Sequence, residues 1–310
     1  MISLNNLVVI MHGESNYYGL NIISSLLKNN YVPKAVLIEK RSRSSSGLLK
    51  ELKDEMVKAY KKKGVRGVFD KFSRKTIHVM GRLHLMDEWA SYKTYKLASS
   101  HLDYFEFGLE LQSLTLEDRG IDVVYCDNNS EETISYINQN KIDVIIGAPK
   151  LLSRKTITRS NGRFINAHPA YLPYLRGASA EVWAMYYGLN LGATLHFIDP
   201  GIDTGKIIDR VVFPLEEFDT WGTLRLRGKD HCIGLYLKHL ESLCSKKIDP
   251  AYLENQNLFI GKKSYGVTLK DYCYARKNLR KFQQLIRLRK SLGVPNPGMF
   301  YPIESFGQGR

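Results

Sequence analysis

The sequence has few cysteines and no long apolar run. Its four cysteines are widely spaced, and no two of them form a CxxC pair, which argues against a zinc site and against a disulfide framework. No stretch approaches the roughly 18 consecutive apolar residues that indicate a membrane-spanning helix. We therefore expect reduced, buried thiols, no bound metal and no membrane span.

An export signal is also missing from the beginning of the chain. The first residues, MISLNNLVVIMHG, contain an apolar stretch, but no basic region precedes it and no small-residue cleavage pattern follows it. They predict a first β-strand, and the expected location of the protein is the cytoplasm.

Acidic residues are scarce relative to basic ones. The chain has 45 Lys and Arg against 31 Asp and Glu, a formal net charge of +14. The excess is local, because residues 40–75 contain thirteen Lys or Arg against four acids, and residues 276–290 contain seven without an acid. Basic side chains on one face can bind nucleic acid by charge alone. A solvated basic face explains both segments at least as well, so a nucleic-acid partner is disfavoured but stays open.

Short apolar runs separated by helix-length segments recur along the 310-residue chain. The predicted strands lie at residues 7–13, 34–40, 121–127, 141–149, 163–169, 192–199 and 209–215. Strands joined in this way by helices are typical of βαβ crossovers and a parallel sheet. The sequence predicts an α/β, Rossmann-like fold with a mostly parallel sheet.

Two segments depart from this rhythm. Residues 41–119 include Leu48, Leu52, Met56 and Tyr60 at a spacing of four, which predicts an amphipathic helix within a basic helical insertion. After a helix predicted at 220–243, the strand rhythm is lost apart from a basic helix near 272–290. We expect a main domain over residues 1–245 and a small C-terminal extension over residues 246–310.

Asn166 and His168 stand two positions apart at the end of a predicted strand, in the stretch FINAHPAYLP. Side chains alternate along a strand, so both point to one face, while Ile165 and Ala167 point to the other. The carboxyl ends of strands are where open α/β sheets bind ligands. An amide and an imidazole placed there supply hydrogen-bond donors for the charge that develops on a carbonyl oxygen during acyl transfer to an amine.

Asp203 lies in the loop DPGIDTG, some thirty-five residues further on. Gly201 and Gly205 are expected to supply unusual backbone dihedrals there, and a carboxylate near His168 would orient the ring. No nucleophile motif such as GxSxG accompanies these residues, which favours direct transfer over an acyl-enzyme. From spacing alone, a strand-capping Asn166 and an ordinary loop histidine stay an open alternative.

Residues 163–210 closely resemble the catalytic core of the folate-dependent formyltransferases. That family includes methionyl-tRNA formyltransferase, glycinamide ribonucleotide transformylase and the sugar N-formyltransferases. The resemblance rests on an Asn-x-His-Pro strand end, a Leu-Pro-x-x-x-Gly loop and an Asp-x-Gly turn. It implies the formyltransferase fold, with Asn166, His168 and Asp203 as the catalytic residues and N10-formyltetrahydrofolate as the formyl donor.

The resemblance also implies where the pterin ring of the donor binds. The loop GAPKLLS matches the stretch whose main-chain atoms hold the pterin, although Pro149 and Lys150 depart from the commoner residues. Residues of the DPGIDTG loop form the opposite side of the pterin pocket. The implied donor-binding residues are Pro149, Lys150, Leu151, Leu152, Asp199 and Ile202.

The acceptor amine is inferred by elimination within the family. Only 107 residues follow Asp203, too few for the C-terminal barrel of methionyl-tRNA formyltransferase once the core is complete. The loop MHGESNYYG turns aromatic where glycinamide ribonucleotide transformylase has a glycine-rich phosphate loop. A nucleotide-linked amino sugar, used in surface polysaccharide biosynthesis, is therefore the leading acceptor.

Other interpretations stay open at this point. A formyltransferase acting on methionyl-tRNA or another amine comes second, and a formyltetrahydrofolate hydrolase or a silent folate-binding module comes third. Aromatic residues near the end of the chain suit base stacking, a homodimer face or simple packing. They are Tyr252, Tyr265, Tyr272, Tyr274, Phe300 and Tyr301.

Overall fold

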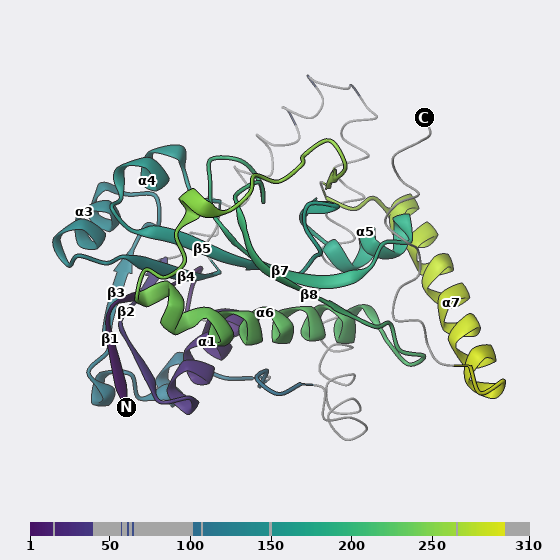
Figure 1. The fold of residues 1–310 in the computed structure, drawn as a ribbon, viewed down its shortest axis with the longest axis horizontal. Helices are drawn as coiled ribbons and strands as arrows, with labels where there is room; N and C mark the ends of the chain where they lie inside the picture. The colour runs from purple at the N-terminus through teal and green to yellow at the C-terminus, as the bar shows by residue number, and fades with distance from the viewer. Residues whose placement is uncertain are drawn as a thin grey trace.

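The computed structural model describes residues 1–14, 16–39, 57, 61, 64, 102–106, 108–148, 151–264 and 266–294. Within them, one seven-stranded sheet has the order β3-β2-β1-β4-β5-β7-β8 (Figure 1). Its strands are β1 (Ile2–Met11), β2 (Tyr31–Glu39), β3 (Asp122–Cys126), β4 (Val144–Ala148), β5 (Arg163–His168), β7 (Leu191–Phe197) and β8 (Ile207–Phe213). Neighbours from β3 to β5 run parallel, and β7 is antiparallel to both β5 and β8. The predicted α/β fold with a mostly parallel sheet is confirmed.

Helices follow the strands and begin at polar capping residues. They are α1 (Tyr17–Lys28), α3 (Glu131–Gln139), α4 (Arg154–Arg159), α5 (Ala180–Tyr187), α6 (Trp221–Cys244) and α7 (Leu269–Ser291). The side chains of Thr220 and Thr268 each accept a hydrogen bond from the backbone N–H three residues further on. The side chain at that third position accepts a hydrogen bond from the backbone N–H of the threonine in return. These capping boxes explain why the two longest helices start where they do.

The central strands of the sheet are buried on both faces. Successive residues of β1 divide between two apolar clusters: Leu7, Val9 and Met11 pack with α1 and α6 on one side, and Val8 and Ile10 pack with α3 on the other. Strands covered on both faces read as continuous apolar runs, which is why the sequence pattern located them.

Part of the predicted insertion lies within the described residues. Residues 102–106 contact the core: the Asp230 carboxylate accepts the backbone N–H groups of Asp103 and Tyr104 at 3.2 and 2.8 Å. Asn21 of α1 also donates to the Glu106 carbonyl oxygen at 2.9 Å. Most of the insertion, including the predicted helix near Leu48, lies outside the described residues.

The sequence pattern missed a second, two-stranded sheet. In it β6 (Leu175–Gly177) pairs in parallel with β9 (Lys262–Ser264), so a C-terminal segment lies directly beside the loop that follows β5. Three-residue strands have too few positions to show periodicity. The division into a domain over 1–245 and an extension over 246–310 stays a prediction.

The aromatic residues near the end of the chain have different surroundings. Tyr272 packs against Trp221 at 5.6 Å between ring centroids, and Tyr274 against Tyr186 at 4.8 Å. Tyr252 is 88% exposed, and the remaining three predicted aromatics lie outside the described residues.

The four cysteines are free thiols. Cys126 and Cys232 are buried, Cys244 is partly buried and Cys273 on α7 is exposed, so the expectation of buried thiols was wrong for Cys273 and holds only in part for Cys244. Among the described helices, none is both long and apolar enough to cross a membrane.

Candidate active site

Asn166 and His168 share one face of β5, as their spacing predicts. Ile165 and Ala167 lie in the apolar cluster on the opposite face. Across the antiparallel pair, Asn166 stands opposite His196 of β7. Asn166 and His168 therefore lie at the carboxyl end of the last parallel strand, where the sheet changes to antiparallel.

Asp203 is held in place by backbone geometry and by the loop after β5. Its own φ is +51°, whereas neither Gly201 nor Gly205 has a positive φ, so the expected role of those glycines was wrong. Gly205 is needed for space instead, because a Cβ there would lie 1.8 Å from the Phe197 carbonyl oxygen. The Gly177 backbone N–H donates to Asp203 Oδ2 at 2.8 Å, which aims the carboxylate towards β5.

The three predicted catalytic residues line one cavity of about 600 Å³. His168 Nε2 lies 3.7 Å from Asp203 Oδ2. His168 is 7% exposed, and no described group lies within hydrogen-bonding distance of its Nε2. A buried ring nitrogen without a hydrogen bond, beside a carboxylate and facing a cavity, is suited to exchange a proton with a bound molecule.

A second histidine, His196, completes the polar end of the cavity. Its Nδ1 donates to the Phe197 carbonyl oxygen at 2.8 Å, and its Nε2 lies 3.4 Å from Asn166 Nδ2 and 3.8 Å from Asp203 Oδ1. Burial lowers the pKa of His196 to about 4. His196 is therefore neutral at pH 7, and its Nε2 accepts from and orients the Asn166 amide. Sequence reasoning missed this residue, although it lies only three positions before the DPGIDTG loop.

Tyr236 of α6 supports the strand that carries the site. Between β4 and β5 the ladder pairs only three positions, ending at Ile146 and Ile165. Beyond it, the Tyr236 hydroxyl accepts from the Ala167 N–H at 2.8 Å and donates towards the Ile165 carbonyl at 3.3 Å. The Tyr236 hydroxyl thus takes the place of backbone hydrogen bonds that are missing between β4 and β5 beyond Ile165, in the stretch that carries Asn166 and His168. Nothing in the local pattern of α6 predicted this contact.

The predicted donor-binding loop is partly described. Leu151 and Leu152 line the cavity, Leu151 with 75% of its surface exposed. The Asn129 side chain fixes the backbone of this loop with two hydrogen bonds. Its amide nitrogen donates to the Leu151 carbonyl oxygen at 3.1 Å, and its amide oxygen accepts from the Ser153 N–H at 2.6 Å. Pro149 and Lys150 lie outside the described residues.

The opposite wall comes from the loop after β7. Ile202 and Asp199 line the cavity. Asp199 Oδ1 accepts from the Thr204 hydroxyl at 2.5 Å and the Gly201 N–H at 3.0 Å, so this carboxylate is engaged in shaping the loop. Among the residues that the structure describes, no group of His, Cys, Asp or Glu could hold a metal ion.

A cation lies at another part of the cavity. Lys229 of α6 lines it, with its Nζ 4.3 Å from the centre of the Tyr17 ring and 3.0 Å from the Tyr17 hydroxyl. The aromatic ring and hydroxyl hold the ammonium group in position. The cavity thus combines an apolar wall, a polar end with Asn166, His168 and Asp203, and a fixed positive charge.

The fold and site define an α/β protein with a ligand cavity beyond the carboxyl ends of its central strands. Residues 120–240 match the family model described as formyl transferase, and the resemblance found in the sequence is confirmed at that level.

Curated relatives match a similar part of the chain. Phosphoribosylglycinamide formyltransferase of Mycobacterium tuberculosis is 37% identical over 87 residues, 28% of this chain and 40% of that protein. The human trifunctional purine biosynthetic protein adenosine-3 is 32% identical over 96 residues, 30% of this chain and 10% of that protein. The chain thus spans less than half the length of either relative.

Solved structures share the fold over much more of the chain. WlaRD, a sugar 3-N-formyltransferase, superposes with a TM-score of 0.52 at 16% identity, covering 90% of this chain and 81% of that one. An N-formyltransferase from Helicobacter canadensis gives 0.51 at 14% identity, covering 90% and 82%. The formyltransferase fold therefore extends beyond the segment matched by the family model.

Proposed function

We propose that this protein transfers a formyl group from N10-formyltetrahydrofolate to a primary amine of a phosphate-bearing small molecule. The observation that carries the proposal is the convergence of Asn166, His168 and Asp203 at one end of a cavity of about 600 Å³. The family match over residues 120–240 supports the same reaction.

The cavity suits the proposed donor. Leu151, Leu152 and Ile202 give it apolar walls of the kind that bury a flat heterocycle. The unpaired His168 Nε2 marks the polar end, where the formyl group would lie. When bound, the donor supplies a formyl carbon that is open to attack by an amine.

The protein residues then have distinct roles. Asn166 donates from its amide nitrogen to the oxygen that becomes negative as the amine attacks, and protonated His168 donates to the same oxygen. Asp203, 3.7 Å from His168 Nε2, stabilises the charged imidazole and accepts the proton that the amine loses. The bond between the formyl carbon and N10 of the donor then breaks, this proton passes to N10, and tetrahydrofolate leaves. His196 holds the Asn166 amide in its donating orientation.

We propose a nucleotide-linked amino sugar as the acceptor. Two solved structures that share the fold over 90% of this chain are a sugar 3-N-formyltransferase, with dTDP, and an N-formyltransferase in complex with dTDP-3-aminofucose. Lys229 supports a phosphate-bearing acceptor, because its fixed ammonium lines the cavity. A role in surface polysaccharide biosynthesis and a cytoplasmic location belong to this proposal.

A phosphoribosyl amine is the second candidate. It is favoured by the 37% identity to phosphoribosylglycinamide formyltransferase over 87 residues. That acceptor also carries phosphate, so Lys229 suits both candidates and does not distinguish them.

An acceptor panel tests the proposal. Release of tetrahydrofolate from N10-formyltetrahydrofolate would be followed with dTDP-linked 3-amino and 4-amino sugars, phosphoribosylglycinamide, initiator methionyl-tRNA and no acceptor. We expect release that depends on one amino sugar. Release with another amine would replace the acceptor, release without an acceptor would indicate a hydrolase, and no release with any acceptor would refute formyl transfer.

Replacing Lys229 by alanine tests whether this lysine contacts a phosphate group of the acceptor. We expect KM for the acceptor to rise by about tenfold or more, because one charge-assisted contact is lost, while KM for the donor changes little. Steady-state kinetics with each substrate varied in turn would measure both. Equal increases in the two KM values would argue against a phosphate contact.

A further inference from the structure

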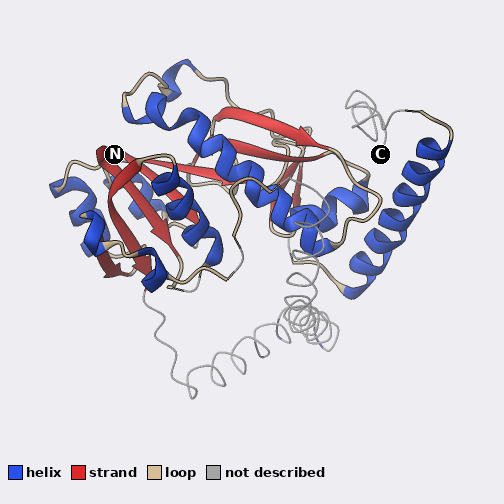
Figure 2. Cartoon of the chain, turned by 90° about the horizontal axis from the view of Figure 1, so that it is seen from below, coloured by secondary structure: helices blue, strands red, loops and turns tan. Residues whose placement is uncertain are grey.

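The outer face of α7 is a basic and apolar surface that the proposed activity does not use. Helix α7 lies at one end of the molecule, opposite α3 and α4 (Figures 1 and 2). Its inner face is buried through Ala275, Leu279 and Ile286, in an apolar cluster shared with α5. The helix is therefore part of the folded body, with one side turned outward.

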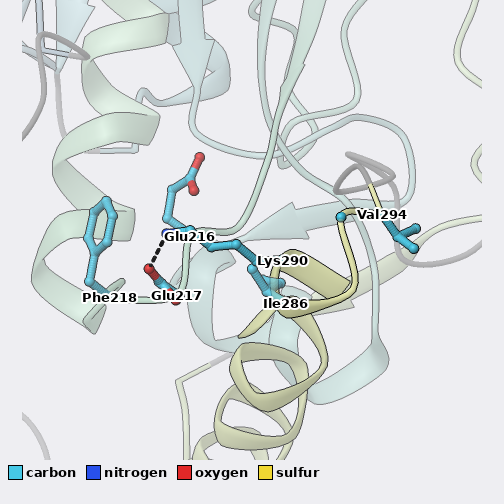
Figure 3. A pocket seen from close by; sticks show the side chains of 7 residues that line it. Glu216, Glu217, Phe218, Ile286, Lys290 and Val294 are labelled. Atoms are coloured by element: carbon cyan, nitrogen blue, oxygen red, sulfur yellow. Dashed lines mark hydrogen bonds and ion pairs between the residues drawn. The ribbon is translucent and has the colours of Figure 1, made fainter. Parts of the chain in front are cut away.

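Hydrogen bonds and an ion pair fix the rotation of α7 about its axis. Asn278 Nδ2 donates to the Met185 carbonyl oxygen at 3.0 Å, and Gln283 Nε2 donates to the Asp219 carbonyl oxygen at 2.8 Å. Near the end of the helix, Lys290 Nζ lies 2.9 Å from a Glu217 carboxylate oxygen (Figure 3). The outward face is thus set by contacts along the whole length of α7.

Three leucines form a stripe on that outward face. Leu285, Leu288 and Leu292 are 52%, 55% and 68% exposed. At 3.6 residues per turn they fall within an arc of about 60°, roughly 130° away from the buried face. Single exposed leucines are ordinary, but a continuous stripe on a well-anchored helix indicates a surface that contacts something apolar.

Lysines extend the same face, on a helix that is strongly positive as a whole. Residues 269–291 contain eight Lys or Arg and one acid, Asp271, whose carboxylate is engaged at the N-cap by Thr268. Lys270, Lys277 and Lys281 continue the stripe towards the start of the helix and are exposed. None of the three forms an ion pair with any residue that the structure describes.

We propose that the outer face of α7 binds the surface of an anionic lipid bilayer. Leucines of an amphipathic helix lying in the membrane plane bury in the headgroup and acyl boundary, and lysines on long stems reach the lipid phosphates. A second copy of the chain is a poor occupant, because pairing two such faces would bring like charges together. Nucleic acid would satisfy the lysines but leave the leucines in water. This inference is independent of the proposed activity.

Vesicle flotation with the full chain tests the proposal. We expect the protein to float with phosphatidylcholine vesicles that contain phosphatidylglycerol and not with phosphatidylcholine alone, and binding to weaken as salt is raised. The combined variant Leu285→Gln, Leu288→Gln and Leu292→Gln is expected to bind about tenfold more weakly or worse, since its apolar contact is lost. The variant Lys277→Glu with Lys281→Glu should also lose binding.

A matched control carries three glutamines at another exposed apolar run. Leu258, Phe259 and Ile260 are 40%, 100% and 44% exposed, and their replacement should leave flotation unchanged. Circular dichroism and unfolding of all variants would test whether the fold is kept. Glutamine is a good helix former, so the three substitutions at the end of α7 should not disturb the helix.

Several outcomes would overturn the proposal. They are wild-type protein that does not float with anionic vesicles, flotation that the leucine substitutions do not weaken, and equal weakening in the control. A dimer that the leucine substitutions dissociate, seen by light scattering, would assign the face to a second copy. Retention of an RNA oligomer in place of vesicles would assign it to nucleic acid.

Discussion

Asn166 and His168 line the same cavity because they are two residues apart on β5. Asp203 reaches them from another loop, with a left-handed backbone and a hydrogen bond from the Gly177 N–H. The alternation of side chains along β5 thus orients Asn166 and His168, whereas the loop conformation orients Asp203. Their joint effect on a bound formyl group is the central hypothesis at this scale.

Alanine at Asn166 or His168 should remove activity without unfolding the protein. We expect kcat to fall by about 10²–10³-fold for Asn166→Ala, the usual loss of one oxyanion donor, and by about 10²–10⁴-fold for His168→Ala. Steady-state kinetics and urea unfolding would measure the two effects. Ile157→Val, a change in the wall of the same cavity, is the control, and wild-type rates in both alanine variants would contradict the assignment.

His196 should make stability depend on pH. Burial lowers its pKa to about 4, against about 6.5 in an unfolded chain. Between pH 6.5 and 4 the unfolded chain binds this proton and the folded protein does not, so the free energy of unfolding falls as pH falls, by roughly 3 kcal/mol across the window. Urea unfolding at several pH values would show this slope reduced in His196→Gln. The same slope in variant and wild type would contradict the prediction.

At the scale of elements, α6 does more than cover the sheet. Its Tyr236 hydroxyl accepts the Ala167 N–H between Asn166 and His168. The strand end therefore depends on a helix about seventy residues further along the chain. Strands and helices were predictable because their apolar periods and capping residues are local, whereas this contact joins two elements and has no local signature.

Removing that hydroxyl should weaken both the fold and the catalyst. Tyr236→Phe leaves the buried Ala167 N–H without its acceptor, which costs about 1–3 kcal/mol of stability, and we expect kcat to fall because Asn166 and His168 lose a fixed strand between them. Unfolding and kinetics would be compared with Tyr31→Phe, whose hydroxyl donates to Glu241 at an exposed position. An equal loss of stability in the two variants would refute the special role of Tyr236.

For the whole molecule, residues far apart in sequence build a single cavity. Ser264 and Gly266 line it beside residues of the loop after β5, because β9 pairs with β6. Gln256 also donates to the carbonyl oxygens of Asp203 and Gly205, at 3.2 and 2.5 Å. The C-terminal part of the chain thus contributes to the site.

Gly177→Ala should disturb this assembly. Gly177 has a φ of +101°, and a Cβ there would lie 2.3 Å from the Ser264 carbonyl oxygen, so β9 must shift and the hydrogen bond to Asp203 is strained. We expect a loss of stability larger than the roughly 1–2 kcal/mol that a left-handed alanine costs, together with a lower kcat. Gly120→Ala has a φ of +71° and meets nothing within 4 Å, so it measures the backbone cost alone. Similar losses in both variants would contradict the proposed role of β9.

The sequence by itself determined the α/β class, the places of the main strands and helices, and the shared face of Asn166 and His168. These follow from periods of two and 3.6 residues and from caps, which act over a few positions. Only the tertiary structure decided that His196 joins the site, that the Tyr236 hydroxyl hydrogen-bonds to the end of β5, that Gly177 orients Asp203, and that α7 turns its leucines outward. These are contacts between distant segments, and a local pattern carries no information about which distant groups meet when the chain folds.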